Sequence, residues 1–254
     1  MYTRERTDWW AQRSRMPDHQ RAYELVAAYL GRGRVTIDHC CGNAELLKRV
    51  YQAYIKRNPQ AFAKENAPLL IGTDLVPETL EVASENLRRA GIESVIINDV
   101  SDIAKRSGVV FIQDDLSQSR LPQELSDNSV FMFAELTYRL DTPRVREIMD
   151  ADPNSDSLTV RAKIITRTLS AVTKVRGSVV ICDYAMSKGG DSSMDRKLLK
   201  QEREVAEDSG LHLTFAPFTM SQEVWEDIGE EERLNLAKPN TKKGYRTLIY
   251  NKLR

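Results

Sequence analysis

The stretch "VTIDHCCGNAELL" (residues 35–47) decides how the rest of the sequence is interpreted. Its first four residues are an apolar run that ends in an acid, which is typical of a buried strand, and "AELL" begins an amphipathic helix. A short turn between a strand and a helix is where nucleotide-binding proteins place a glycine-rich loop. This turn has one glycine, Gly42, and two adjacent cysteines, so it could be a cofactor loop, a metal or thiol site, or a simple connection.

The cysteines of this turn do not have the spacing of a metal site. His39, Cys40 and Cys41 are consecutive, and consecutive residues of an extended chain point to opposite faces. Structural zinc ligands are typically separated by about two to four residues, and the one other cysteine is Cys182. We therefore expect no metal here. We interpret Cys40 and Cys41 as small residues packed in a tight turn, with His39 directed away from Asp38.

The bulk composition is that of an ordinary globular protein. The chain has 254 residues, 41% hydrophobic and 29% charged, which suffices for a sizeable core. Lys+Arg and Asp+Glu both number 37, so the net charge gives no support to a polyanionic partner. No apolar run approaches the roughly 20 residues that span a bilayer, and the N-terminus lacks the apolar core of a secretory signal. Because three cysteines fit a reducing compartment, we expect a cytoplasmic protein without membrane contact; its oligomeric state is left open.

Short apolar runs alternate with longer amphipathic segments, a pattern that predicts βαβ units. We expect an α/β fold: a doubly wound, mostly parallel sheet of about seven strands with a C-terminal antiparallel hairpin. Residues 1–254 are expected to form a single domain, in which residues 1–30 are a helical N-terminal cap or lid that carries Trp9 and Trp10. The predicted strands are 35–38, 69–74, one of 95–97 and 109–112, 129–136, 177–185, 211–218 and 245–251, and the predicted helices are 18–30, 44–57, 76–91, 158–174 and 194–210.

Two acids end the first two predicted strands, Asp38 and Asp74. In an open parallel sheet, ligands bind at the carboxyl ends of strands near the switch point, so Asp74 is well placed to accept hydrogen bonds from both hydroxyls of a ribose. A fixed carboxylate at Asp38 would repel a pyrophosphate, whereas it would favour a ligand that carries an ammonium and a sulfonium. The electrostatics therefore favour S-adenosylmethionine over a nicotinamide dinucleotide.

The segment 35–47 resembles the first motif of the class I (Rossmann-like) S-adenosylmethionine-dependent methyltransferases, an acid followed by a Gly-x-Gly-x-Gly turn. Asp38 matches the acid and Gly42 the middle glycine, while Cys40 and Ala44 stand where the first and third glycines are usual. "LIGTDLVPETLEVASENL" looks like the second motif, with Asp74 as the ribose-binding acid. The two acids are 36 positions apart, which predicts a first helix extended by a turn or more.

"FIQDDLSQSRLPQELSDNSVFMFAEL" looks like the third motif and the fourth strand. There Asp115 matches the acid near the adenine amino group, with the Leu116 backbone beside it. "VIINDVSD" offers Asp99 as a rival, and Asp115 is preferred because "LPQELSDNSV" follows it in the usual way. The resemblance covers roughly residues 20–185. It implies S-adenosylmethionine as cofactor, S-adenosylhomocysteine as product, and a cofactor site that also includes Cys40, Asn43, Leu75 and Glu135.

The resemblance implies methyl transfer, for which in-line positioning supplies much of the acceleration. Glu135 and Tyr138 follow the fourth predicted strand, where the methyl group should emerge, so they are the candidate catalytic residues. Our first expectation for the acceptor is a small-molecule O, N or C nucleophile, because "AELTY" differs from the Asp/Asn-Pro-Pro-aromatic motif of amino-methylating nucleic-acid enzymes. The alternatives are an RNA or protein acceptor, a non-catalytic partner subunit of the same fold, and, last, a nicotinamide enzyme.

Overall fold

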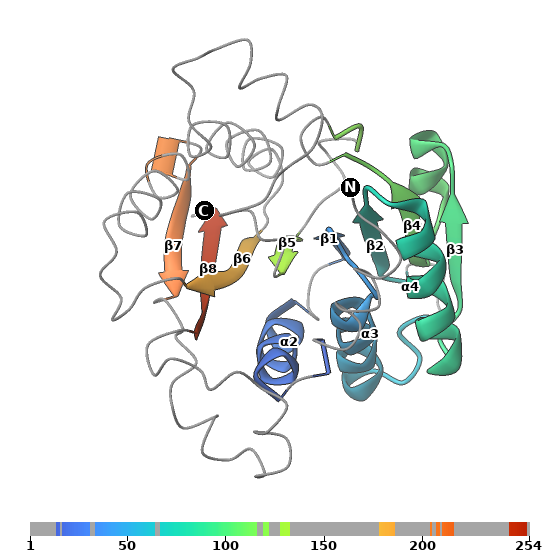
Figure 1. The fold of residues 1–254 in the computed structure, drawn as a ribbon, viewed down its shortest axis with the longest axis horizontal. Helices are drawn as coiled ribbons and strands as arrows, with labels where there is room; N and C mark the ends of the chain where they lie inside the picture. Colours follow the sequence, from blue (N-terminus) through green and yellow to red (C-terminus); the bar gives the residue numbers. More distant parts are fainter. Residues whose placement is uncertain are drawn as a thin grey trace.

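Eight strands form one sheet in the described part of the chain, in the order β3-β4-β2-β1-β5-β6-β8-β7 (Figure 1). The computed structural model describes residues 14–15, 17–30, 34–63, 67–115, 119–121, 128–132, 178–185, 204, 207–208, 210–215 and 244–252. The strands are β1 (Val35–His39), β2 (Leu69–Asp74), β3 (Ser94–Ile97), β4 (Gly108–Gln113), β5 (Asn128–Met132), β6 (Ser178–Ala185), β7 (Leu211–Phe215) and β8 (Gly244–Lys252). The helices are α2 (Pro17–Leu30), α3 (Glu45–Arg57), α4 (Pro77–Arg89) and the 3-10 helix η1 (Val100–Lys105).

The sheet is mostly parallel, which confirms the predicted α/β class. All neighbouring pairs from β3 to β6 are parallel, and β8 pairs antiparallel with both β6 and β7. The connection between β7 and β8, residues 216–243, lies outside the described residues. Since β1 has β2 on one side and β5 on the other, the strand order reverses at β1, and this is the switch point of the sheet.

The expectation that only one of the apolar runs 95–97 and 109–112 is a strand is wrong. Both are strands: β4 pairs with β2, and β3 pairs with the outer side of β4. The described sheet therefore has eight strands where about seven were predicted. The added strand is a four-residue edge strand, and short apolar runs of this kind are ambiguous in sequence alone.

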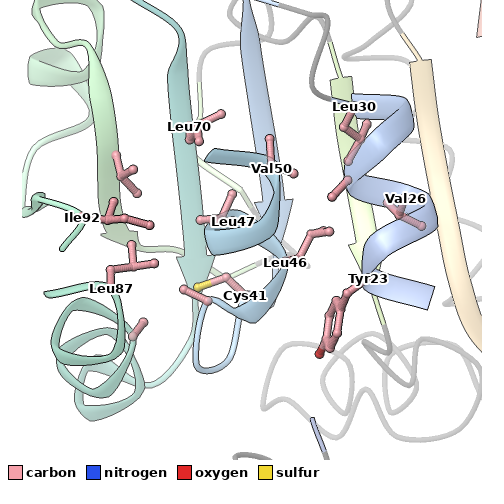
Figure 2. Packing of buried hydrophobic residues seen from close by; sticks show 14 of the residues in the cluster. Tyr23, Val26, Leu30, Cys41, Leu46, Leu47, Val50, Leu70, Leu87 and Ile92 are labelled. Atoms are coloured by element: carbon pink, nitrogen blue, oxygen red, sulfur yellow. The ribbon is translucent and has the colours of Figure 1, made fainter. Parts of the chain in front are cut away.

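The two faces of the sheet are covered differently in the described residues. Helices α2, α3 and α4 share one face, where their apolar residues pack in a single cluster with Leu70, Val109 and Phe111 (Figure 2). On the other face, Ile71 and Val110 pack with Ile103 of η1. The predicted helix 158–174 and most of 194–210 lie outside the described residues, so the doubly wound arrangement stays a prediction.

Gly72 lets α3 lie close against the sheet. A Cβ at this position would stand 2.6 Å from the Phe111 ring and 2.9 Å from Leu47 Cδ1, distances at which side chains clash. The first turn of α3 is therefore held directly over β2, and this fixes the position of the turn between β1 and α3. The extra length between β1 and β2 does not extend α3, which ends at Arg57; it lies in the segment 58–68 instead.

Helix α4 begins and ends where the sequence predicts. Pro77 is at its first position, Glu78 is in its first turn and arginines are in its last turn, as the helix dipole favours. Gly91 follows in the left-handed region, with φ of 72°. Within the residues that the structure describes, no helix is long and apolar enough to cross a membrane.

Candidate functional site

The carboxyl ends of β1, β2 and β4 meet at one edge of the sheet, beside the switch point. The Cys41 amide donates to the Thr73 carbonyl at 2.8 Å, which fastens the end of β1 to β2. The Asp114 amide donates to the Asp74 carbonyl at 3.0 Å, which fastens the end of β4 to β2. The acids that end these strands are thereby gathered in one place, as the sequence predicts for Asp38 and Asp74.

The turn of residues 40–44 alternates between ordinary and left-handed backbone. Cys40, Gly42 and Ala44 have φ of 57°, 54° and 60°, so the three positions where the resemblance expects glycine all have the conformation that glycine favours. At Cys40 and Ala44 this conformation costs roughly 1–2 kcal/mol each. A Cβ placed on Gly42 would meet none of the described residues within 4 Å, so these residues leave the space over its backbone open.

Contacts from other elements hold this turn. The Gly42 amide donates to Asp74 Oδ2 at 3.2 Å. Asn86 Nδ2, in α4, donates to the Asn43 carbonyl at 2.8 Å, and Asn43 Nδ2 donates to Ser14 Oγ at 2.8 Å. Sequence reasoning missed Asn86 and Ser14. Their partner lies 43 and 29 residues away in the chain, and no local pattern marks such a contact.

Asp38 is a buried carboxylate whose bonding is incomplete. Its side chain is on the α3 face of β1, the residue is 2% exposed, and Oδ1 has no hydrogen-bond partner among the described residues. Burial raises the pKa of the Asp38 carboxyl well above its ordinary value, and the neighbouring Asp74 raises it further. A buried unsatisfied carboxyl is costly, so this atom marks a place where a hydrogen-bond donor or a cation would be favourable.

Both carboxyl oxygens of Asp74 accept hydrogen bonds, whereas Oδ1 of Asp38 has no partner among the described residues. Its Oδ1 accepts from the Val76 amide at 3.1 Å, and its Oδ2 accepts from Gly42. Burial raises the pKa of the Asp74 carboxyl, and these backbone hydrogen bonds offset part of that rise. The side chain therefore joins the two strand-to-helix connections of β1 and β2.

The cysteines are packing residues with protonated thiols. Cys41 is buried in the core under α3 (Figure 2), and Cys40 is half-buried. Burial and four nearby carboxylates raise the pKa of the Cys40 thiol; in decreasing order of effect these belong to Asp74, Asp38, Asp115 and Asp114. In the described part of the chain no group of three or more His, Cys, Asp or Glu side chains could hold a metal ion.

Solved structures resemble this chain over nearly its whole length. The [4+2]-cyclase SpnF matches with a TM-score of 0.55 at 18% identity, over 92% of this chain and 81% of its own. The methyltransferase domain of bacterial-CtHen1-C matches with a TM-score of 0.53 at 14% identity, over 91% and 97%. Geranyl diphosphate methyltransferase in complex with SAM (S-adenosylmethionine) matches with a TM-score of 0.52 at 12% identity, over 92% and 86%.

The fold is that of the class I S-adenosylmethionine-dependent methyltransferases. At these identities the likeness concerns the fold alone. No protein-family model matches the chain, and no curated protein matches it in sequence.

The two rival acids take different places in this methyltransferase fold. Asp99 follows the edge strand β3, is exposed, and accepts from the Ser101 amide at 2.8 Å as the cap of η1. Asp115 follows β4, the direct neighbour of β2, and contributes to the negative potential at Cys40. The geometry therefore favours Asp115 as the acid of the candidate site.

Asp114, which no sequence motif distinguished, is the buried anchor of the segment after β4. It accepts hydrogen bonds from Ser119 Oγ and from the Arg120 amide, the latter at 3.0 Å. Leu75, next to Asp74, is 38% exposed, and its carbonyl accepts from Gln113 Nε2 at 3.0 Å. The other predicted site residues lie outside the described residues: Leu116, Glu135 and Tyr138, and with them Trp9 and Trp10 of the predicted lid.

Proposed function

We propose that this protein is a cytoplasmic S-adenosylmethionine-dependent methyltransferase that acts on a small-molecule O, N or C nucleophile. The observation that carries the proposal is the turn of residues 40–44. This turn lies next to the switch point, beside a carboxyl oxygen of Asp38 that has no hydrogen-bond partner among the described residues. The methyltransferase fold of the structural neighbours, one of them in complex with SAM, supports the cofactor.

Two features of the turn fit a cofactor with a cationic amino-acid end. Asp38 Oδ1 is buried without a described partner, and an ammonium group would offset the cost of that burial. The open space at Gly42 allows a ligand to approach the backbone closely. When bound, S-adenosylmethionine would supply a methyl group activated by its sulfonium.

Asp74 would bind the ribose. An ionised carboxylate offers about four acceptor positions, and the amides of Gly42 and Val76 take one on each oxygen. The Leu75 amide also contributes to Asp74, and the acceptor capacity that remains would serve the ribose hydroxyls. The exposed side chain of Leu75 would cover the adenine ring. We assign the rest of the cofactor site to Asp115, Leu116, Asn43, Cys40 and Glu135.

A nicotinamide dinucleotide fits this site less well, because its pyrophosphate would face several acids. At an effective dielectric of about 20, two unit charges about 4 Å apart interact by about 4 kcal/mol. A helix N-terminus contributes about 0.3–1 kcal/mol to anion binding, and up to about 2 in favourable cases. When the carboxyl groups around Cys40 are ionised, their repulsion of a pyrophosphate outweighs the attraction of the α3 N-terminus, so the ionised site favours a cation.

Glu135 and Tyr138 would line the acceptor pocket. They follow β5, the strand on the other side of the switch point from β2. We assign Glu135 to hold an amine or hydroxyl of the acceptor and to take its proton, and Tyr138 to orient it. Alignment of the acceptor and exclusion of water can supply several kcal/mol of the acceleration.

One observation favours a second candidate, a protein of this fold that does not transfer methyl groups. SpnF is named a [4+2]-cyclase, so a fold of this kind also occurs in a protein named for another reaction. The non-glycine residues at positions 40 and 44 are consistent with a relaxed demand on the turn. This second candidate covers two cases: an enzyme that catalyses another reaction, and a non-catalytic partner subunit.

A methyl-transfer assay on fractionated extract separates the candidates. The protein is incubated with S-adenosylmethionine labelled in its methyl group and with small-molecule, RNA or protein fractions, and Asp74→Ala serves as control. We expect label in the small-molecule fraction, lost in Asp74→Ala. Label confined to the RNA or protein fraction would mean that the acceptor is RNA or protein and not a small molecule. Cofactor binding without label in any fraction would favour the second candidate.

A further inference from the structure

The turn between β1 and α3 keeps the backbone of a glycine-rich loop at positions that are not glycine. Cys40 and Ala44 both have left-handed backbone, which is disfavoured for residues with a Cβ. Strained residues of this kind persist only where the surrounding structure determines their conformation. Contacts from outside the turn must therefore hold it.

Two such contacts meet at Asn43, which lies between Gly42 and Ala44. The side-chain amide of Asn86, in the last turn of α4, donates to its backbone carbonyl at 2.8 Å. Its own side-chain amide donates to Ser14 Oγ, also at 2.8 Å. The backbone and the side chain of one residue are thus fixed by two separate segments of the chain.

Ser14 is itself firmly placed. It is 3% exposed, and the side-chain amide of Gln20 donates to its backbone carbonyl. The same amide group lies 3.4 Å from Glu45 Oε1, in the first turn of α3. Ser14 is therefore linked to α3 and can act as a fixed anchor for Asn43.

We propose that Asn86 and Ser14 are positioning residues of the cofactor site, which hold the turn of residues 40–44 in the conformation that glycines at 40 and 44 would favour by themselves. The inference rests on the proposed function, since it concerns the backbone that the cofactor approaches. If the two anchors are removed, Cys40 and Ala44 can relax toward negative φ. The Gly42 amide then moves away from Asp74 Oδ2. Asp74, which would bind the ribose, and the turn of residues 40–44 then no longer contact the cofactor together.

The test is a titration of S-adenosylhomocysteine by calorimetry in two backgrounds. One background is the natural chain, and the other carries Cys40→Gly and Ala44→Gly. In each, Asn86→Ala removes the anchor. Ser84→Ala is the matched control, because it removes a hydrogen bond of the same helix, to Ser94 Oγ at 2.9 Å, away from the turn.

We expect Asn86→Ala to weaken binding about fivefold in the natural background, the effect of one hydrogen bond, and less than about twofold in the glycine background. We expect Ser84→Ala to change it less than about twofold in both. A purely structural role of Asn86 predicts the same loss in both backgrounds, and that result would overturn the proposal, as would unchanged binding. If Asn86→Ala does not fold, Ser14→Ala is measured in its place with the same expectations.

The proposal can fail separately from the proposed function. Absence of binding to the natural chain would contradict the cofactor, not the anchors. Amide hydrogen exchange without ligand then decides: the anchors predict faster exchange of the Cys41 and Gly42 amides in Asn86→Ala than in Ser84→Ala. Equal exchange in the two variants would contradict them.

Discussion

The connections β1–α3 and β2–α4 run from a parallel strand to a helix at the same edge of the sheet, and they are built in opposite ways. The second needs two residues: Leu75 and an extended Val76, followed by Pro77 at the first helical position. The first needs five residues and has left-handed backbone at Cys40, Gly42 and Ala44. Asp74, which ends β2, is hydrogen-bonded to two backbone amides, whereas one oxygen of Asp38, the penultimate residue of β1, has no described partner.

The difference teaches where this chain departs from local preference. The β2–α4 connection follows the rules of strand end, extended cap and proline start, so its conformation is the one that local preference favours. The β1–α3 connection departs from local preference in two ways. Non-glycine residues have left-handed backbone, and a buried acid has an oxygen without a described hydrogen-bond partner. Departures of this kind concentrate at functional sites, and here they coincide with the place where the proposed cofactor binds.

Asp74 is the side chain that joins the two connections, so its removal should have the largest effect. We expect Asp74→Ala to weaken S-adenosylhomocysteine binding at least about 100-fold, because hydrogen bonds to a charged group contribute about 1.5–3 kcal/mol each. Calorimetric titration measures the loss. Asp99→Ala is the control, because it removes an exposed cap that follows β3, a strand separated from β2 by β4. It should bind like the natural chain; equal losses in the two variants would contradict the assignment.

His39 ends β1 on the face away from Asp38. Its buried imidazole should make the stability of the β1 end of the sheet depend on pH. Burial lowers the pKa of His39 to about 3 from its ordinary 6.5. Between about pH 6.5 and pH 3 the His39 side chain is protonated in the unfolded state and neutral in the folded state. The free energy of unfolding therefore decreases as the pH falls through this range. We expect His39→Leu to remove a dependence of about 1.4 kcal/mol per pH unit in that window.

Urea unfolding of the natural chain and of His39→Leu at pH 7, 6, 5 and 4.5 measures this dependence. The difference in slope between the two proteins is the relevant quantity, because Asp38 titrates in both. Parallel pH profiles would mean that the pKa of His39 is the same in the folded and unfolded states, and would contradict the prediction.

Asp38→Asn should raise the free energy of unfolding and weaken cofactor binding. The pKa of Asp38 is raised, so the folded state keeps a proton that the unfolded state has already lost, and the acid costs more stability as pH rises above about 4. We expect the free energy of unfolding of Asp38→Asn to exceed that of the natural chain by about 1–3 kcal/mol at pH 8, the range for an unsatisfied buried polar group, and by less at pH 4.

The same substitution should weaken cofactor binding, since it removes the partner of the ammonium group. Urea unfolding and calorimetry on the one variant measure both effects. A variant that is less stable than the natural chain at pH 8 would show that the Asp38 carboxylate is fully satisfied in the folded protein.

Cys40→Gly should give the smallest effect, by relaxing the strained connection. The left-handed residue costs roughly 1–2 kcal/mol, and glycine loses about 0.5–1 kcal/mol through the flexibility of the unfolded chain, so we expect a net gain of about 0.5–1 kcal/mol. Cys40→Ala keeps the Cβ and should give no such gain. Urea midpoints compare the two variants, and equal stability would remove the argument from strain.

Much of the fold could be predicted from local patterns. The strands at 35–38 and 69–74 and the helix from Pro77 are in the predicted places, because apolar runs and proline or glycine punctuation act over a few residues. The runs 95–97 and 109–112 were rivals for one strand. That both are strands was not predicted, because Val95 and Ile96 are exposed and the pairing of β3 with β4 is not visible locally. The same limit applies at the site: motif spacing identifies Asp38, Gly42 and Asp74, whereas the anchors of Asn43 come from distant segments.

The central claim is that the two unlike connections form one S-adenosylmethionine site, and a crystal structure of the protein with S-adenosylhomocysteine tests it most directly. The account predicts the ribose hydroxyls on the Asp74 carboxylate, the amino-acid end over Gly42 with its ammonium beside Asp38, and the adenine against Leu75. A ligand bound elsewhere in the molecule, or over the turn with the ribose away from Asp74, would contradict it.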